Sequence, residues 1–345
     1  MTSGHRFPYR WRLADLKPPA ADAPTVFSTF ACAGGSTMGY KLAGYRALGC
    51  CEIDPTTNNV YRTNLHPKYN YVEDIRDFLG RDDLPDELYD LDVLDGSPPC
   101  TTFSMAGDRE KSWGVEKKFA EGQKKQTLDD LYFVYADLVG KLRPRAFVSE
   151  NVAGLIKGNA RAYVTEVLKK FRSIGYDVQV FLLNAMYMGV PQSRERTFIV
   201  GNRIGAPKLS LSFDEEPIKF GEFKSPHGVP FNDGELKKRV DLRRVGDRTL
   251  QDADKRCFGR ENMFNHIYVY DDGVAATVTA VGTIIRFSDG ERFSESDLVY
   301  VSSFPEDYDF CGAANSKVKF YVGMSVPPVM MANIAYEVRL QWLGK

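Results

Sequence analysis

The chain has 345 residues, about two domains of ordinary size, which is enough to bury a large core without disulfide bonds or structural metals. Hydrophobic residues make up 43% and charged residues 26% of the chain, a balance that excludes disordered, fibrous and low-complexity proteins. The 45 basic and 46 acidic residues give a net charge of −1, which excludes a uniformly basic nucleic-acid coat but permits local basic surfaces.

No uncharged segment of the sequence is apolar and long enough to cross a bilayer, which needs about 20 apolar residues. Residues 1–23 lack the apolar core of a secretory signal, so we expect a cytoplasmic protein without a membrane anchor. The six cysteines form no Cys-x-x-Cys pair and are not accompanied by a histidine cluster. Neither a disulfide framework nor a metal site is therefore expected.

In chain order, the first 200 residues alternate short β-branched or aromatic runs with helical segments. We expect strands at 25–31, 45–53, 91–97, 145–151, 177–183 and 196–201. Helices are expected between them, at 37–43, 56–65, 128–142 and 160–171. This alternation predicts an α/β fold with a Rossmann-like, doubly wound, mostly parallel sheet of six or seven strands.

After Gly201 the pattern changes, because prolines interrupt it and no long helical period returns until the end of the chain. We expect a smaller inserted domain of short strands and loops, followed by an apolar-striped helix that begins near Pro328 and returns to the first domain. The predicted organisation is an N-terminal extension at 1–23, a main domain at 24–204 plus 317–345, and the inserted domain with its hinge at 205–316.

A run of small residues after the first strand is the first candidate for binding. Phe30 to Gly35 follow the strand and open a helix, where backbone N–H groups can approach a ligand closely. The next strand ends in Glu52, whose carboxylate could bind ribose hydroxyls. Together they suggest an adenosine-type cofactor. A purely structural glycine turn is the alternative, since the spacing typical of dinucleotide-binding loops is absent.

Two further strands end in residues with reactive or charged side chains. The run Asp95 to Ser104 carries Cys100 after a Pro-Pro turn, at the sheet edge where ligands bind in open α/β folds. A buried, inert loop cysteine is the alternative.

Glu150 ends another apolar strand and could share a proton, or it could simply cap a helix. Arg194 lies just before the strand at 196–201 and Arg196 begins it; both could face the same region, or lie in a solvated turn.

The order of these segments resembles the DNA (cytosine-5)-methyltransferase family. The matching runs are TFACAGGSTMGYKLAGY, Glu52, Asp74-Ile75, GSPPCTTFS, SENV, PQSRERTFIVG and YVGMSVPP, and the similarity covers nearly all of 25–204 and 317–342. The resemblance implies a Rossmann-like catalytic domain, an inserted target-recognition domain, and methylation of carbon 5 of a flipped-out cytosine in a specific site of duplex DNA. It implies an enzyme of prokaryotic or phage type, such as those of restriction-modification systems. We expect a monomer, because one active site that acts on one flipped base needs no partner subunit.

For the chemistry, the resemblance implies that Cys100 adds to carbon 6 of the cytosine and thereby makes carbon 5 nucleophilic. Glu150 corresponds to the residue that supplies a proton or hydrogen bond to ring nitrogen 3 and holds the exocyclic amine. Arg196 corresponds to the residue that grips the cytosine carbonyl, and Arg194 to a partner that orders the same site. Positive charge there also lowers the pKa of a thiol.

The resemblance also implies S-adenosylmethionine as the cofactor. Phe30 matches the aromatic residue packed against it, Gly34 the turn near its methionine part, and Glu52 the ribose carboxylate. The full set of expected cofactor contacts is Phe30, Ala31, Gly34, Gly35, Glu52, Ile53, Asp74, Ile75, Ser97, Pro99, Met324, Ser325 and Val326.

Two positions depart from the family pattern. Cys32 stands where the family usually has Gly, and Met324 stands where it usually has Asn. Cys32 is conservative in size. Met324 is not, because a thioether replaces an amide in the wall near the cofactor, and this puts the affinity or even the identity of the cofactor in question.

Two segments outside the motifs are basic. Arg109 to Lys125 contains six basic and three acidic residues, and its position after Cys100 suits a loop that closes over DNA. Glu235 to Arg260 contains nine basic and five acidic residues. Such clusters bind phosphates without reading sequence, although most charged runs are simply solvated surface. Two alternatives stay open: the same chemistry on tRNA, or a catalytically silent DNA-binding relative.

Overall fold

The computed structural model describes residues 4–99, 130–156, 160–280 and 282–344. By packing, the chain forms two compact units. The larger unit comprises Lys17–Asn184, Glu195–Ser212 and Met331–Lys345, and the smaller unit comprises Met1–Leu16, Ala185–Arg194 and Phe213–Met330. These units differ in outline from the predicted domains, because 1–16, 185–194 and 317–330 pack with the smaller unit. The division into catalytic and recognition domains remains a prediction about function.

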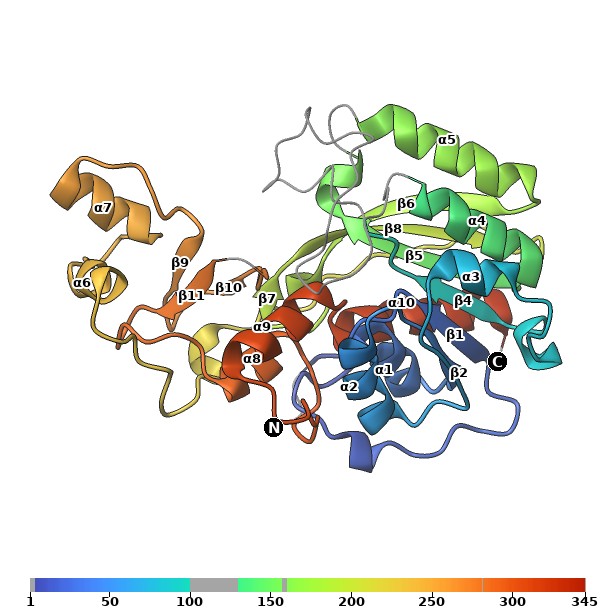
Figure 1. The fold of residues 1–345 in the computed structure, drawn as a ribbon, viewed down its shortest axis with the longest axis horizontal. Coiled ribbons are helices and arrows are strands. Elements are labelled where there is room, and N and C mark those ends of the chain that lie inside the picture. Colours follow the sequence, from blue (N-terminus) through green and yellow to red (C-terminus); the bar gives the residue numbers. More distant parts are fainter. Residues whose placement is uncertain (1–3, 100–129, 157–159, 281, 345) are drawn as a thin grey trace. The chain divides into compact units, whose positions relative to one another are not determined.

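A seven-stranded sheet organises the larger unit, in the order β3-β2-β1-β4-β5-β8-β6 (Figure 1). Its strands are β1 (Thr25–Thr29), β2 (Arg46–Cys51), β3 (Tyr69–Tyr71), β4 (Val93–Gly96), β5 (Ala146–Val152), β6 (Asp177–Asn184) and β8 (Glu195–Asn202). The first five are parallel, whereas β8 runs antiparallel to both β5 and β6. The predicted α/β, mostly parallel sheet is thus confirmed.

Helices cover both faces of this sheet (Figure 1). On one face lie α1 (Gly35–Leu42) and α2 (Pro55–Leu65), and on the other lie α3 (Ile75–Gly80), α4 (Leu131–Leu142) and α5 (Ala160–Ser173). Side chains alternate between faces along a strand, so Phe27, Leu94 and Phe147 share the α3–α5 face and form one buried core with those helices. The residues directly before and after these three in each strand therefore point toward the face that α1 covers.

The described part of the smaller unit contains two pairs of short strands and four helices. The strands are β7 (Gln192–Ser193) paired with β10 (Ala275–Ala276), and β9 (His266–Val269) paired with β11 (Thr283–Arg286). The helices are α6 (Glu235–Asp241), α7 (Leu250–Phe258), α8 (Glu295–Val301) and α9 (Asn315–Met324). The prediction of only strands and loops was therefore wrong here, because helices of seven to ten residues are too short to show a clear period.

Helix α10 (Pro328–Val338) follows the Ser-Val-Pro turn, as the sequence predicts, and from Met331 onward it belongs to the larger unit. Tyr45 fixes it there by donating to the carbonyl of Ala335 at 2.9 Å. Short 3-10 turns lie at Leu13–Asp15, Asp86–Leu88, Ala153–Ile156, Ala185–Tyr187 and Phe220–Glu222, and a π turn at Arg339–Leu343.

Within the described ranges, no helix is long and apolar enough to span a membrane. The same residues contain no group of three or more His, Cys, Asp or Glu side chains that could hold a metal ion. Five cysteines are described, and all five are free thiols.

Candidate active site

The topology gathers most of the predicted site residues at one edge of the larger unit's sheet. Strands β1, β2, β4 and β5 are parallel, so their carboxyl ends meet at the same edge. They deliver Phe30–Gly35, Glu52, Ser97–Pro99 and Glu150 there. Arg196 joins them because β8 is antiparallel and begins at that edge, where Arg196 pairs with Val152.

The loop after β1 is strained. Phe30 and Cys32 have φ angles of +52° and +48°, in the left-handed region that non-glycine residues rarely adopt. Gly34, with φ of +80°, forms the N-cap of α1, where a Cβ would lie 2.4 Å from a Leu65 methyl carbon. Ala31 and Gly35 are buried beside them. Strained backbone of this kind clusters at ligand-binding sites, and the left-handed φ explains why glycine suits the position of Cys32.

Glu52 holds this loop in place. Its Oε2 accepts the backbone N–H of Cys32 at 2.8 Å, and its Oε1 accepts the N–H of Asp54 at 3.0 Å. The side chain is mostly buried, and the neighbouring Ile53 is half-buried. A carboxylate fixed by two backbone donors at a sheet edge has the orientation and acceptor chemistry to bind the vicinal hydroxyls of a ribose.

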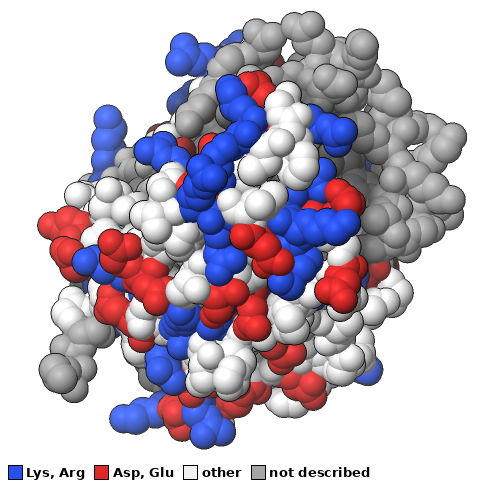
Figure 2. Space-filling view, turned by 90° about the vertical axis from the view of Figure 1, so that its left-hand side faces the viewer, with Lys and Arg blue, Asp and Glu red and all other residues white. Residues whose placement is uncertain are grey.

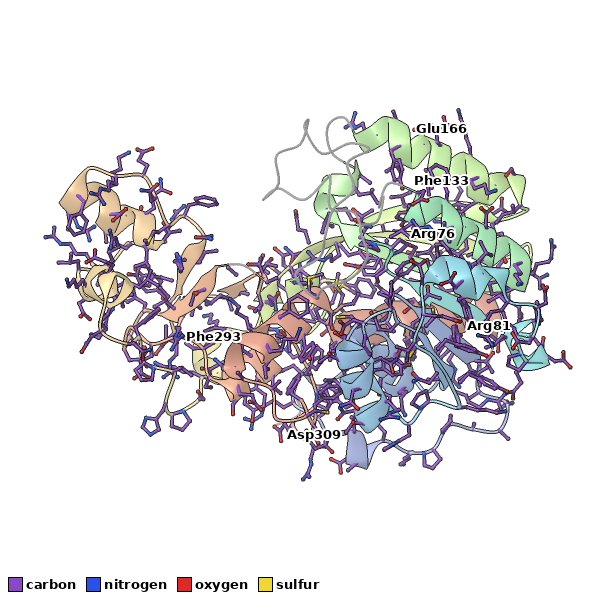
Figure 3. The ribbon with its side chains drawn as sticks, in the orientation of Figure 1. Arg76, Arg81, Phe133, Glu166, Phe293 and Asp309 are labelled. Carbon is purple, nitrogen blue, oxygen red and sulfur yellow. The ribbon has the colours of Figure 1, made fainter. Side chains whose placement is uncertain are left out.

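Asp74 and Ile75 follow β3 at the start of α3. Asp74 caps that helix by accepting the N–H of Arg76 at 2.8 Å. Its carboxylate also pairs with the guanidinium of Arg76, which is labelled in Figure 3 and bridges to Asp130 at 2.6 Å. Ile75 is buried in the core. The observed role of Asp74 is therefore to fix the start of α3.

The segment before Cys100 is anchored from β5. Asn151 donates from Nδ2 to the carbonyl of Pro98 at 2.8 Å, which fixes the turn formed by Ser97, Pro98 and Pro99. Ser97 and Pro99 are half-buried. Cys100 itself lies outside the described residues, as does the basic segment at 109–125.

Glu150 and Arg196 form an ion pair at the sheet edge. Arg196 Nε lies 2.8 Å from Glu150 Oε1, and the two side chains are only 14% and 11% exposed. Arg196 also donates from Nη1 to the carbonyl of Glu195 at 2.8 Å. Burial lowers the pKa of Arg196, and the charge of Glu150 counteracts this shift. The pair presents a carboxyl group and a planar cation side by side, a combination that can bind a flat heterocycle through adjacent polar atoms.

Arg194 lies in the smaller unit and is 2% exposed. Its guanidinium donates to the carbonyls of Val278, Gly323 and Ser325 at 3.0, 2.8 and 3.1 Å. These bonds hold the turn that contains Met324, Ser325 and Val326. Ser325 and Val326 are buried, whereas Met324, the last residue of α9, is 54% exposed.

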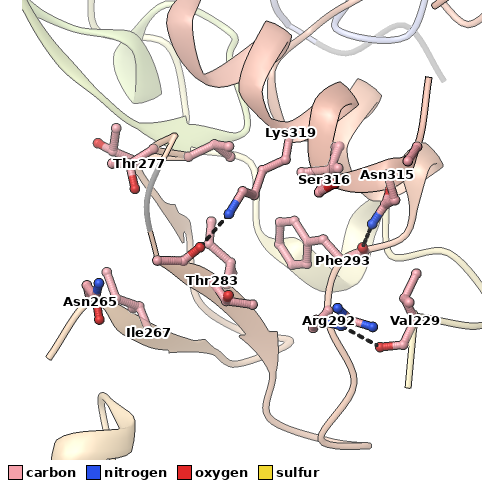
Figure 4. A pocket seen from close by; sticks show the side chains of 16 residues that line it. Val229, Asn265, Ile267, Thr277, Thr283, Arg292, Phe293, Asn315, Ser316 and Lys319 are labelled. Atoms are coloured by element: carbon pink, nitrogen blue, oxygen red, sulfur yellow. Dashed lines mark hydrogen bonds between the residues drawn. The ribbon is translucent and has the colours of Figure 1, made fainter. Parts of the chain in front are cut away.

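The described part of the smaller unit also contains a pocket of about 300 Å³ (Figure 4). Its lining includes Arg292 and Lys319 but no carboxylate among the described residues. Lys319 donates to the carbonyl of Gly282, and Asn315 donates to the carbonyl of Phe293 at 3.1 Å. Burial, with a smaller contribution from Arg292, lowers the pKa of Lys319. Two cations without a lining carboxylate suit an anionic group.

Sequence reasoning missed two residues of this region. The sequence predicts no role for Asn151 beyond its place in the SENV run. Its role as the anchor of the Pro98 turn depends on the pairing of β4 with β5. Asp95 on β4 is 1% exposed, and only its place as one of two acidic residues in the apolar run LDVLD could have signalled it.

Comparison with known proteins identifies the family. The family model for C-5 cytosine-specific DNA methylase matches residues 25–265, more than half of the chain. The chain belongs to the C-5 cytosine-specific DNA methylase family. Its curated relatives include the type II methyltransferase M1.HphI of Haemophilus parahaemolyticus, 27% identical over 91% of this chain and 86% of that protein. M.Sau96I of Staphylococcus aureus is 38% identical over 52% of this chain, but only 38% of that protein is covered.

The fold agrees with solved structures. A DNA modification methyltransferase encoded within an E. coli prophage aligns with a TM-score of 0.66 over 94% of this chain and all of that chain, at 17% identity. This likeness confirms the expected fold, and the family match confirms the expected resemblance to the cytosine-5 methyltransferases. Methylation of carbon 5 of cytosine in DNA is the reaction for which this DNA methylase family is named, and type II modification enzymes are its curated relatives.

Proposed function

We propose that this DNA methylase transfers a methyl group from S-adenosylmethionine to carbon 5 of a cytosine flipped out of a specific site in duplex DNA, through a covalent adduct with Cys100. The observation that carries the proposal is the Glu150–Arg196 pair, with its 2.8 Å contact at the carboxyl edge of the sheet. The pair adjoins the turn that leads into Cys100, since Asn151, the residue after Glu150, anchors Pro98.

The pair complements the pairing edge of cytosine. That edge presents a carbonyl oxygen, ring nitrogen 3 and an exocyclic amine in sequence. Arg196 can donate to the carbonyl, while Glu150 can give a proton to nitrogen 3 and accept from the amine. A base within a duplex hides this edge in its Watson–Crick pair, so the substrate must leave the helix. The same arrangement supports recognition of cytosine over thymine, whose ring nitrogen 3 carries its own proton.

Glu150 then acts as the acid for addition of the thiolate. As the sulfur of Cys100 bonds to carbon 6, the electron pair of the carbon 5–carbon 6 double bond moves through the ring toward nitrogen 3. A proton from Glu150 neutralises that nitrogen, and carbon 5 becomes nucleophilic. General-acid help of this kind typically contributes about 10²–10⁴-fold. The resulting carboxylate is held by Arg196, which compensates its charge in a largely buried setting.

The donor set of the sheet edge fits S-adenosylmethionine. When bound, this cofactor supplies an electrophilic methyl group. Glu52, fixed by two backbone N–H groups, would hold the ribose hydroxyls. The left-handed loop at Phe30–Gly34 leads into the start of α1, where the methionine part of the cofactor is expected. Ile53 and Ile75 would supply apolar contacts to the adenine. The contacts expected from Met324, Ser325 and Val326, which belong to the smaller unit, rest on the family resemblance alone.

Surface charge in the smaller unit supports duplex DNA as the partner. In the view that faces α6 and α7, basic and acidic side chains are interspersed (Figure 2). Five of the nine basic residues in 235–260 are paired with carboxylates, namely Lys237, Lys238, Arg239, Lys255 and Arg256. Arg244, Arg248 and Arg260 are exposed and have no ion pair in the described part of the chain. These three arginines and the Arg292–Lys319 pocket are our candidates for phosphate contacts.

The test is methyl transfer from labelled cofactor to duplex DNA and to tRNA in parallel assays. We expect incorporation into duplex DNA only, by a monomer acting in the cytoplasm of a bacterial or phage-infected cell. Incorporation into tRNA alone would replace the proposed substrate, and no incorporation into either would indicate a silent DNA-binding relative. Bisulfite sequencing of DNA from cells expressing the chain would identify the methylated site.

A further inference from the structure

A short turn that joins helices α6 and α7 in the smaller unit exposes an unusual set of side chains (Figure 1). Its residues, 243–248, read Arg-Arg-Val-Gly-Asp-Arg. Val245 is 89% exposed, and no other large hydrophobic side chain in the described ranges is as exposed. Arg244 and Arg248, on either side of it in the chain, are exposed as well. An apolar side chain that is exposed to this degree stabilises the fold little through burial, whereas it can stabilise a complex that covers it.

Hydrogen bonds fix the backbone of this turn. The Asp247 carboxylate accepts the N–H of Arg244 at 2.8 Å, and the carbonyl of Arg244 accepts the N–H of Asp247 at 2.9 Å. The Tyr270 hydroxyl accepts the N–H of Gly246 and donates to the carbonyl of Asp247, both at 2.9 Å. Gly246 has a φ of +99°, which glycine adopts without strain. The turn is therefore preorganised, and a partner that binds it loses little free energy to ordering the backbone.

The arginines of the turn keep their charge without a carboxylate partner. Asp247 is buried, and its carboxylate accepts two hydrogen bonds from Arg256, at 2.7 and 3.0 Å, which lower the pKa of Asp247. Asp252 accepts the backbone N–H of Arg248 at 2.7 Å and caps α7. Neither Arg244 nor Arg248 forms an ion pair within the described part of the chain. Both guanidinium groups therefore stay available to an anionic partner.

We propose that the turn at 243–248 enters a groove of the duplex DNA substrate, with Arg244 and Arg248 on backbone phosphates and Val245 against the base edges between them. The proposal deepens the proposed function and rests on duplex DNA as the substrate. Phosphates border a groove on both sides, so two cations that flank one apolar group match its distribution of charge. Base edges form the floor of the groove and include apolar groups such as the thymine methyl, against which a valine can pack.

The phosphate contacts are tested by the salt dependence of binding to a fluorescent duplex that carries the methylated site. Each phosphate contact contributes a slope of about −0.9 to a plot of log affinity against log salt concentration. We expect Arg244→Ala and Arg248→Ala each to make the slope about one unit less steep. Lys237→Ala removes the same charge from a lysine that pairs with Asp241 at 2.7 Å, and this matched control should keep the wild-type slope. Wild-type slopes in both arginine variants would overturn the proposal.

The apolar contact is tested with Val245→Ala and Val245→Asp in the full chain. Because Val245 is exposed, neither change should alter thermal unfolding. Val245→Ala removes two carbons from the proposed contact, so we expect it to bind the duplex about tenfold more weakly with an unchanged salt slope. Val245→Asp would bring a carboxylate toward the phosphates and should bind more weakly still. Wild-type affinity in either variant would overturn the proposal.

Methyl transfer separates this proposal from the proposed function. The arginine and valine variants should raise the KM for DNA, with the KM for the cofactor and the kcat at saturating DNA unchanged. If wild type neither binds nor methylates duplex DNA, the proposed function fails. If wild type does both and the variants match its affinity and its salt slope, only the role of the turn is rejected.

Discussion

At Cys32 a non-glycine residue occupies a backbone conformation that glycine adopts without strain. The φ of +48° costs a residue with a Cβ about 1–2 kcal/mol. Cys32→Gly removes that strain but makes the unfolded chain more flexible, which costs about 0.4–1 kcal/mol. We expect a net rise of about 0.5–1 kcal/mol in the free energy of unfolding, measured by urea denaturation. Cys32→Ala keeps the Cβ and should show no rise. A destabilised Gly variant would mean that the cysteine side chain makes a compensating contact.

Met324 lies in a turn whose backbone is held by buried Arg194, while its own side chain is half exposed. A thioether offers adaptable apolar contact but neither the donor nor the acceptor of an amide. We expect Met324→Asn to bind S-adenosylmethionine more tightly by about 1 kcal/mol, the usual contribution of one hydrogen bond. Calorimetric titration of S-adenosylmethionine into wild type and into Met324→Asn measures the two affinities. Weaker binding by the variant would show that the methionine side chain packs better in this pocket than asparagine does.

A buried ion pair joins helices α6 and α7. Arg239 Nε lies 2.6 Å from Asp254 Oδ1, and both side chains are buried. Asp254→Ala would leave the guanidinium buried without this partner. Arg239 still pairs with Glu235 at 2.8 Å, so the usual 3–5 kcal/mol cost should fall to about 2 kcal/mol. Thermal unfolding should show this loss. The exposed Lys237–Asp241 pair is the control, and Asp241→Ala should cost less than about 1 kcal/mol.

Elements with strong periodicity could be predicted from the sequence, and short ones could not. The strands at 25–31 and 145–151 and the helix at 56–65 match β1, β5 and α2 within two residues at each end. Strand β3 and helix α3 were missed because three and six residues are too few to show a period. The antiparallel direction of β8 depends on pairing between distant segments, which a local pattern does not encode.

In the candidate site, too, the residues at strand ends could be predicted, whereas contacts between distant segments could not. Strand ends placed Glu52 and Glu150 at one edge, because parallel strands deliver their carboxyl ends together. The guanidinium of Arg194 instead holds backbone carbonyls in the smaller unit, a role that only the folded chain reveals. The place of Asp95 beside Val148 could not be predicted either, because it arises from the register between β4 and β5.

At the scale of the whole molecule, activity requires the duplex to release one base. Extracting a base costs a few kcal/mol, and less when its partner is mismatched or missing. DNA that carries the target cytosine opposite a wrong base or a gap should therefore bind about tenfold or more tightly than matched DNA. Equilibrium binding with fluorescent duplexes measures the difference. Equal affinities for matched and mismatched sites would argue against base flipping.

The most direct measurement is covalent trapping on duplex DNA that contains 5-fluorocytosine at the target site, in the presence of the cofactor. Fluorine at carbon 5 cannot leave as a proton does, so the bond between Cys100 and carbon 6 persists. We expect wild type to form a stable protein–DNA adduct on a denaturing gel, and Cys100→Ser to form none while still binding duplex DNA. Methyl transfer without any adduct, or an adduct in the Cys100→Ser variant, would contradict the mechanism.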